Sequence, residues 1–186
     1  MKRRKTLALN TMRELNHYWK SMRTSIATKM RILNAYVAPI AIYNAYLWSM
    51  NNTRNGEIDA FQRRLLRYAI NIKHPRHISN DALYEITKAI PWSKIIVHRR
   101  LSWFGHLMRL PAGTPVRKAL QEAETPVKLP RGRPKTTWLE CMKEQLRKDV
   151  GAEWECAKAM AADRKGWKGV VNGLRPQMAQ VPGTRR

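Results

Sequence analysis

Apolar residues recur at steps of three and four along most of this chain, which is the spacing of one helix face. One such stripe lies in residues 12–22, a second in 26–47 and a third in 58–72, and residues 92–110 carry two stripes side by side. No stretch shows the strict alternation of a half-buried strand. The pattern therefore predicts an all-α fold, with a central helix at 92–110 and a first helix that carries Met12, Leu15, Trp19 and Met22 on one side.

Local signals predict where several helices begin and end. The polar turn at 51–56 is expected to close the second helix, and Ser79-Asn80-Asp81 is a good N-terminal cap for a short helix. Pro91 precedes the helix at 92–110, and Thr137 with Glu140 has the spacing of a capping box. A last helical stretch is expected at about 153–171.

Residues 111–135 break the helical pattern with five prolines and two glycines, which predicts a linker or extended arm. The expected organisation has five parts in chain order. They are helices in 1–52, a basic helical region in 53–110, a Pro/Gly/Arg-rich arm in 111–136, a small C-terminal helical unit in 137–172 and a flexible tail in 173–186.

The segment 32–50 carries no charge and is about as long as a membrane span. Two asparagines, a serine and the central Pro39 weaken its hydrophobic drive, so we predict a helix that is buried on most sides and bent at Pro39. We expect no membrane partner. The basic start of the chain is not followed by the apolar run of a secretory signal, and we do not expect secretion.

The net charge of the chain indicates that this helical protein has a polyanionic partner. The chain has 36 Lys and Arg against 13 Asp and Glu, a formal net charge of +23, while 44% of its residues are hydrophobic. That apolar content suffices for a core, and the charge favours nucleic acid over a small-molecule substrate.

Two of the core-forming helices carry clusters of arginines. The guanidinium group suits both bidentate phosphate contacts and stacking on bases. Alternatively, these arginines form a solvated helix face or pair with Glu57, Asp59 and Glu85. The chain has too few acidic residues to pair with most of its basic residues. The residues predicted to contact nucleic acid on these helices are Arg63, Arg64, Arg67, Arg99, Arg100, His106 and Arg109.

The arm contains Pro130-Arg131-Gly132-Arg133-Pro134-Lys135, which resembles an AT-hook. In that motif, arginines enter the narrow minor groove of A·T-rich DNA, where glycine lets the backbone approach. Arg131, Arg133 and Lys135 are therefore further candidates for nucleic-acid contact, and an architectural minor-groove protein is the alternative function.

The sequence offers no constellation for catalysis. The acidic residues are scattered without an Asp-Asp pair, and no glycine-rich phosphate loop occurs. Cys141 and Cys156 are not part of a metal-binding spacing, and we expect both to be reduced thiols. We predict no catalytic residue, no metal ligand and no cofactor in this chain, and no enzymatic activity on its own.

Five motifs, taken in order, resemble the region after the polymerase core of non-LTR (LINE-type) retrotransposon reverse transcriptases. They are Phe61-Gln62-Arg63-Arg64-Leu65-Leu66-Arg67, Ile78-Ser79-Asn80, the stretch from Arg99 to Pro111 with Trp103-Phe104-Gly105-His106, Gly132-Arg133-Pro134 followed by Trp138, Glu140 and Cys141, and Ala162-Asp163-Arg164 with Trp167. Residues 23–48 resemble the helical thumb that precedes them.

The resemblance implies a thumb-like helical bundle followed by a connection region, which together grip template–primer duplex or element RNA. The catalytic palm, whose paired aspartates bind Mg²⁺, and the endonuclease are absent from this chain. RNA, RNA–DNA hybrid or DNA is then the partner, together with a polymerase core supplied in trans, in the nucleus or a cytoplasmic ribonucleoprotein. A decaying relic without selected activity is the third alternative.

Two tryptophans carry a structural prediction. Trp103 and Trp138 lie on an apolar stripe and at a helix start, and both are expected to be largely buried.

Overall fold

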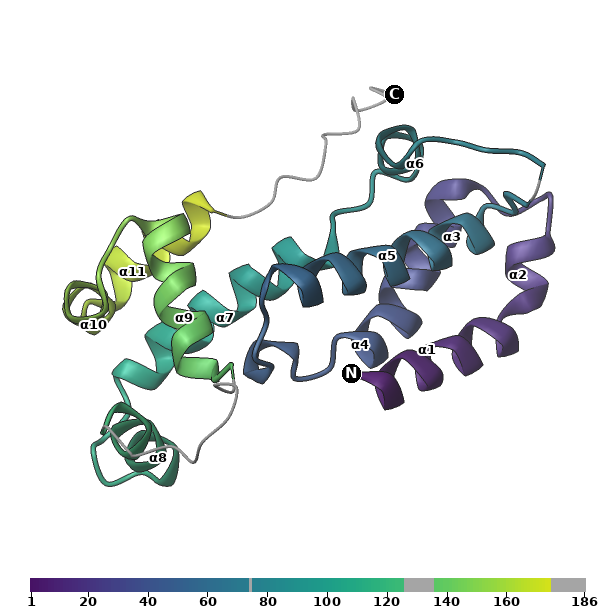
Figure 1. Cartoon of the computed structure of the whole chain (residues 1–186). Coiled ribbons are helices and arrows are strands. Elements are labelled where there is room, and N and C mark those ends of the chain that lie inside the picture. Colours follow the sequence, from purple (N-terminus) through teal and green to yellow (C-terminus); the bar gives the residue numbers. More distant parts are fainter. Residues whose placement is uncertain (74, 126–135, 175–186) are drawn as a thin grey trace. The chain divides into compact units, whose positions relative to one another are not determined.

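The computed structural model describes residues 1–73, 75–125 and 136–174, and within these ranges every regular element is helical (Figure 1). The predicted all-α class is confirmed. The α-helices are α1 (Lys2–Glu14), α2 (Asn16–Lys20), α3 (Ile26–Ile32), α4 (Ala38–Ala41), α5 (Asn52–Ala69), α6 (Asn80–Thr87), α7 (Trp92–Met108), α8 (Pro115–Glu124), α9 (Trp138–Gln145), α10 (Trp154–Ala162) and α11 (Arg164–Gly173). The π-helical turns η1 (Leu33–Val37) and η3 (Leu146–Val150) and the 3-10 turn η2 (Ala45–Leu47) complete the set.

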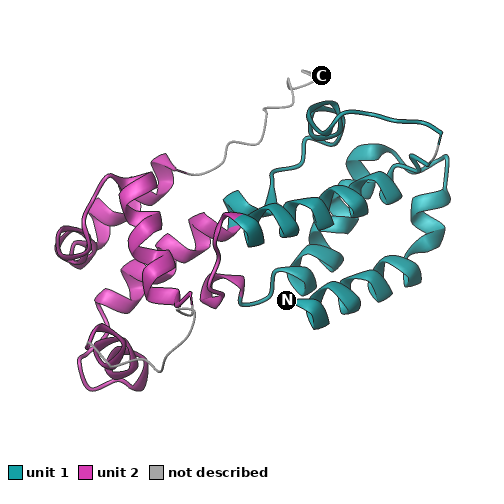
Figure 2. Cartoon of the chain, viewed as in Figure 1, with its two compact units in different colours: residues 1–44, 53–95, 176–186 teal, residues 45–52, 96–175 magenta. Residues whose placement is uncertain are grey.

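The described chain forms two compact units (Figure 2). Among the described residues, unit 1 contains 1–44 and 53–95 apart from 74, and unit 2 contains 45–52, 96–125 and 136–174. The units do not coincide with the five parts expected from the sequence, because α7 contributes its first turn to unit 1 and the rest of its length to unit 2. The short segment 45–52 also packs with unit 2 rather than with the helices that precede it.

Buried polar side chains fix the start of α7 within unit 1. The side chain of Gln62 on α5 donates from Nε2 to the Ile90 carbonyl at 2.7 Å and accepts from the Trp92 backbone N–H at 2.9 Å. Asp59, one turn earlier, accepts from both the backbone N–H and the hydroxyl of Ser93. Four orphan N–H groups begin every helix, and here α5 satisfies two of those of α7.

The uncharged segment 32–50 begins at the last residue of α3 and continues as η1 and α4, followed by a break at Asn44, whose φ is 52°. The wide π-helical turn lies just before Pro39, which has no N–H to bond the carbonyl four residues earlier. Tyr36 and Tyr43 are exposed, so the expectation of burial on most sides is wrong, and the segment buries one side only. No helix in the described ranges has both the length and the apolar character needed to span a bilayer.

Three further expectations need correction. The first helix ends at Glu14, and Met22 is exposed instead of joining Met12 and Trp19 in the core. The turn expected at 51–56 is mostly the first turn of α5. The stretch expected at 153–171 is two helices, since Asp163 caps α11 by accepting from the N–H groups of Lys165 and Gly166, both at 2.9 Å.

The arm expected at 111–136 contains a helix where its residues are described. Pro115 occupies the first turn of α8, a position where its missing N–H costs nothing, and Leu120 buries itself in the unit 2 core. The predicted capping signals at Ser79 and at Thr137 with Glu140 are confirmed.

The core of unit 2 gathers α7, α8, α9, α10 and α11 around aromatic side chains. Phe104 packs against the rings of Trp154 and Trp167, at centroid distances of 5.3 and 5.4 Å. Trp167 also donates from Nε1 to the Leu101 carbonyl at 2.9 Å, and its indole covers Gly105 so closely that an added Cβ would overlap the ring. The motif residues of α7 and α11 therefore meet in a packed core.

Trp103 and Trp138 are partly buried, so the prediction that both are largely buried holds only in part. They line a groove in unit 2 instead of its centre. The fully or nearly fully buried tryptophans are Trp19, Trp92, Trp154 and Trp167.

Candidate nucleic-acid interface

A groove of about 510 Å³ in unit 1 gathers basic side chains from α1, α5 and the turn that follows α5. Its described lining includes four cationic side chains, one tyrosine and no carboxylate. The lining residues are Leu9, Met12, Arg13, Ala60, Arg64, Leu65, Arg67, Tyr68, Ile72 and Lys73. The other lining residues are apolar, so the cations stand beside apolar side chains. We call this site the α1/α5 groove.

The positive charge of the α1/α5 groove is not neutralised by an acid within the described chain. Arg13, Arg64 and Lys73 are exposed, and none forms an ion pair there. Arg67 is half-buried, and its Nη2 donates to neutral acceptors, the Ile78 carbonyl at 3.2 Å and Asn80 Oδ1 at 2.9 Å. Those bonds hold the guanidinium in place and leave its charge intact, which suits an anionic ligand.

Tyr68 supplies an aromatic surface beside these cations. Its side chain is 42% exposed, and its hydroxyl donates to Asn16 Oδ1 at 2.9 Å, which fixes the ring between α5 and the start of α2. An exposed, positioned ring next to arginines is the arrangement on which nucleobases stack in single-strand binding proteins.

Arg63 does not join Arg64 and Arg67 in the α1/α5 groove, although the three residues are close in sequence. It lies near Tyr84 of α6, where it favours the phenolate, but burial outweighs this effect and raises the pKa of the Tyr84 hydroxyl above its usual value of 10. Of the predicted trio, Arg64 and Arg67 therefore line the α1/α5 groove and Arg63 does not.

Within α7, Arg99 and His106 are exposed, as a contact residue must be. Trp103 lies between them at helical spacing, and its ring is 5.3 Å from that of His106. Arg109 is also exposed, and its Nη1 donates to the Ala161 carbonyl at 2.7 Å, so it also closes the end of α10.

Arg100 is a correction to the predicted set. Its side chain is 1% exposed and donates from Nη2 to the Trp48 carbonyl at 3.0 Å, inside unit 2. Burial lowers the pKa of its guanidinium, because the charged form loses hydration. A phosphate cannot reach this group, so Arg100 holds the 45–52 segment against α7 instead of binding a ligand.

The remaining predicted contacts, Arg131, Arg133 and Lys135, lie outside the described residues. The α1/α5 groove in turn contains residues that sequence reasoning missed, namely Arg13, Tyr68 and Lys73. Arg13 follows the apolar position Met12 on an ordinary amphipathic helix, and nothing in the sequence pairs α1 with α5. Only the tertiary structure brings the three residues together.

Among the described residues, no group of three or more His, Cys, Asp or Glu side chains is arranged to hold a metal ion. Cys141 is buried and Cys156 is exposed, both as thiols.

Comparisons with known proteins return no matching family model, no matching curated protein and no matching solved structure.

Proposed function

We propose that this chain binds nucleic acid through its phosphate backbone, as the C-terminal region of a non-LTR retrotransposon reverse transcriptase would, and that it is not catalytic by itself. The observation that carries the proposal is the α1/α5 groove, with four cations, a tyrosine and no carboxylate in its described lining. The ordered sequence motifs support the family resemblance, and the net charge of +23 supports the polyanionic partner.

In this proposal the backbone of RNA, RNA–DNA hybrid or DNA follows the α1/α5 groove. Arg13, Arg64 and Lys73 contact phosphate oxygens, while Arg67 is held by Ile78 and Asn80 and adds its charge. Phosphate contacts of this kind set position and affinity without reading sequence. A polymerase core in trans would supply the chemistry, in the nucleus or a cytoplasmic ribonucleoprotein.

The first experiment is a fluorescence-anisotropy titration with four ligands: RNA–DNA hybrid, single-stranded RNA, A·T-rich duplex and G·C-rich duplex. We expect the tightest binding to hybrid or RNA, and a steep loss of affinity between about 50 and 200 mM salt, because each neutralised phosphate releases condensed counterions. Absence of binding to all four ligands at the lower salt concentration contradicts the proposal.

Paired variants localise the site. Arg13→Ala with Arg64→Ala is expected to reduce the magnitude of the log–log salt slope by about 2, one for each lost phosphate contact. The control, Lys20→Ala with Arg31→Ala, removes the same charge from exposed positions of unit 1 outside the groove. An equal effect of both pairs would mean that net charge, and not the α1/α5 groove, binds the ligand.

The alternative function, minor-groove binding through the arm, has its own outcome in this titration. It predicts a preference for A·T-rich over G·C-rich duplex that disappears in Arg133→Ala. Under the main proposal, the same substitution modestly lowers the affinity for all four ligands, because one phosphate contact is lost.

A further inference from the structure

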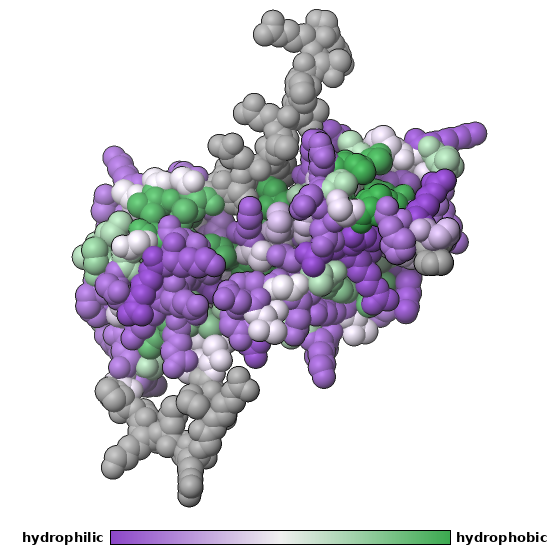
Figure 3. All heavy atoms as spheres, turned by 45° about the horizontal axis from the view of Figure 1, so that its top comes forward, coloured by the Kyte–Doolittle hydropathy of each residue, from purple (hydrophilic) through white to green (hydrophobic). Residues whose placement is uncertain are grey.

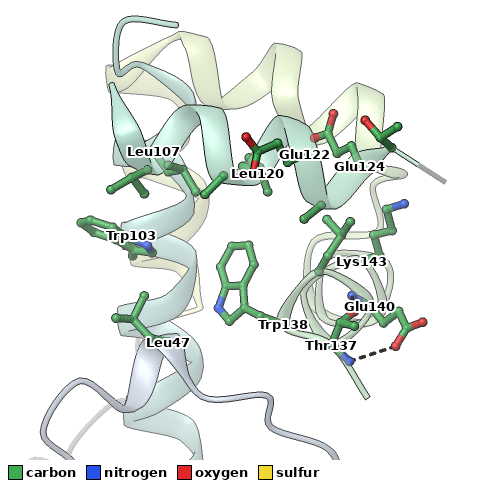
Figure 4. A pocket seen from close by; sticks show the side chains of 15 residues that line it. Leu47, Trp103, Leu107, Leu120, Glu122, Glu124, Thr137, Trp138, Glu140 and Lys143 are labelled. Carbon is green, nitrogen blue, oxygen red and sulfur yellow. Dashed lines mark hydrogen bonds between the residues drawn. The ribbon is translucent and has the colours of Figure 1, made fainter. Parts of the chain in front are cut away.

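A second groove, of about 570 Å³, lies within unit 2 and differs in chemistry from the α1/α5 groove (Figure 4). Most of its lining is apolar, with three glutamates and a single lysine at its edge. The lining residues are Leu47, Trp103, Leu107, Val116, Ala119, Leu120, Glu122, Ala123, Glu124, Thr125, Thr137, Trp138, Leu139, Glu140 and Lys143. We call this site the acid-rimmed groove.

The floor of the acid-rimmed groove is fixed. Trp138 projects from α9 into it (Figure 4), and its Nε1 donates to the Tyr46 carbonyl at 2.9 Å, which holds the indole in place. Trp103 packs against Tyr46 at a centroid distance of 5.3 Å. Leu47 and Val116 at the margin are 47% and 46% exposed, so apolar surface continues out of the groove. Figure 3 shows that apolar patches on one face of the molecule are separate areas within a mostly hydrophilic surface.

Some of the charged side chains at the rim already have partners within the chain, and others can contact a ligand. Glu124 accepts from Trp154 Nε1 at 3.1 Å and pairs with Lys158, and the Lys143 ammonium lies over the Trp154 ring. Glu140 uses one oxygen, Oε2, to cap α9 at the Thr137 N–H. Glu122 is exposed and forms no ion pair in the described chain. The rim therefore presents Glu122 and Glu140 to a ligand, on a molecule whose net charge is strongly positive.

We propose that the acid-rimmed groove binds a basic amphipathic peptide segment of another protein. An apolar side chain of the peptide packs on Trp138 and Val116, and a flanking lysine or arginine pairs with Glu122. Charge complementarity selects this occupant: the carboxylates repel a phosphate backbone and attract a cation, and exposed apolar side chains beside them are typical of a protein interaction site.

The test is anisotropy of a fluorescent peptide of about 12 residues, with leucines at helical spacing flanked by lysines. Binding to this chain at micromolar concentration is expected despite the overall repulsion between two cationic partners. A peptide whose leucines are replaced by serine is expected not to bind. Failure of the leucine peptide to bind, or equal binding of the two peptides, overturns the proposal.

Matched variants assign the site. Glu122→Lys is expected to weaken the peptide about tenfold or more, because a repulsive charge replaces an attractive one. Glu144→Lys makes the same charge change at an exposed α9 position outside the groove and is expected to leave the affinity within twofold. Val116→Ser tests the apolar part, with Met160→Ser as its exposed control on α10. Equal effects within either pair overturn the assignment.

A final experiment distinguishes this proposal from nucleic-acid binding. Arg13→Ala with Arg64→Ala is expected to leave peptide affinity unchanged, since those residues line the other groove. A short single-stranded DNA that competes with the peptide, and whose binding is weakened by Val116→Ser, would identify the acid-rimmed groove as a nucleobase site and overturn the peptide proposal.

Discussion

At the scale of the residue, burial decides what a basic side chain does, and the neighbours Arg99 and Arg100 show it. Sequence treats them alike, because both belong to the basic positions of one helix. In the structure Arg99 is exposed, whereas Arg100 is buried with one bond to the Trp48 carbonyl and a buried Nε that has no partner. One is a candidate for phosphate contact and the other is part of the fold.

We expect Arg100→Ala to lower the free energy of unfolding by about 2–4 kcal/mol, since it leaves a cavity and an unpaired carbonyl. Arg99→Ala should change it by less than about 0.5 kcal/mol, as for most exposed positions. Urea denaturation of both variants is the measurement. A stable Arg100→Ala protein with weakened RNA affinity would reverse the roles assigned to the two residues.

Tyr84 carries a prediction about pH. Burial raises the pKa of its hydroxyl in the folded state above the unfolded value of about 10, and the hydroxyl donates to Gln62 Oε1. Above pH 10 the unfolded chain therefore loses this proton more readily than the folded chain does. Stability that Tyr84 contributes is fully present below pH 10 and is lost as the pH rises through the folded pKa.

The measurement is urea denaturation of the wild type and Tyr84→Phe at pH 8 and above pH 10. We expect the wild type to lose more stability between the two conditions than the variant does, because phenylalanine has no proton to release. Tyr36→Phe, at an exposed position, serves as the control and should follow the wild type. Parallel decline of wild type and Tyr84→Phe would contradict the assignment.

At the scale of the element, signals local to a helix end were readable from sequence and long-range contacts were not. Ser79 and the Thr137–Glu140 pair cap helices as predicted, because capping chemistry involves residues three apart. The prediction of a linker or extended arm was wrong for the segment that begins at Pro115, because proline is also favoured in the first turn of a helix. The α1/α5 groove depends on packing between residues about fifty apart, for which sequence gives no signal.

The contact between Gly105 of α7 and Trp167 of α11 is the long-range contact most open to test. Gly105→Ala improves intrinsic helix propensity but places a Cβ inside the volume of the Trp167 indole, which is also held by the Leu101 carbonyl. We expect a net loss of about 1–3 kcal/mol in the free energy of unfolding, the usual cost of overpacking.

Gly56→Ala in α5 is the matched control, because no neighbouring atom lies within 4 Å of the added Cβ. That substitution should raise the free energy of unfolding by about 0.5–1 kcal/mol. Thermal or urea denaturation compares the two. Stabilisation by both substitutions would show that Trp167 is not packed on Gly105.

At the scale of the whole molecule, a net charge of +23 acts on folding and on binding in opposite directions. Like charges repel within the compact chain, most strongly where cations gather without acids, as in the α1/α5 groove. The same uncompensated charge is what would attract a phosphate backbone. Salt screens both interactions, since the Debye length falls from about 10 Å at 0.1 M to about 3 Å at 1 M.

Raising KCl from about 0.1 to 1 M should therefore raise the urea midpoint of the free protein while it lowers the affinity for RNA or hybrid. Arg13→Ala with Arg64→Ala should reduce both responses, because it removes repulsion and phosphate contacts at one place. The pair Lys20→Ala with Arg31→Ala should reduce the stability response less, since those exposed residues do not line the groove. If added salt destabilised the free protein, charge repulsion would not be a main cost of this fold, and the α1/α5 groove would need no anion to relieve it.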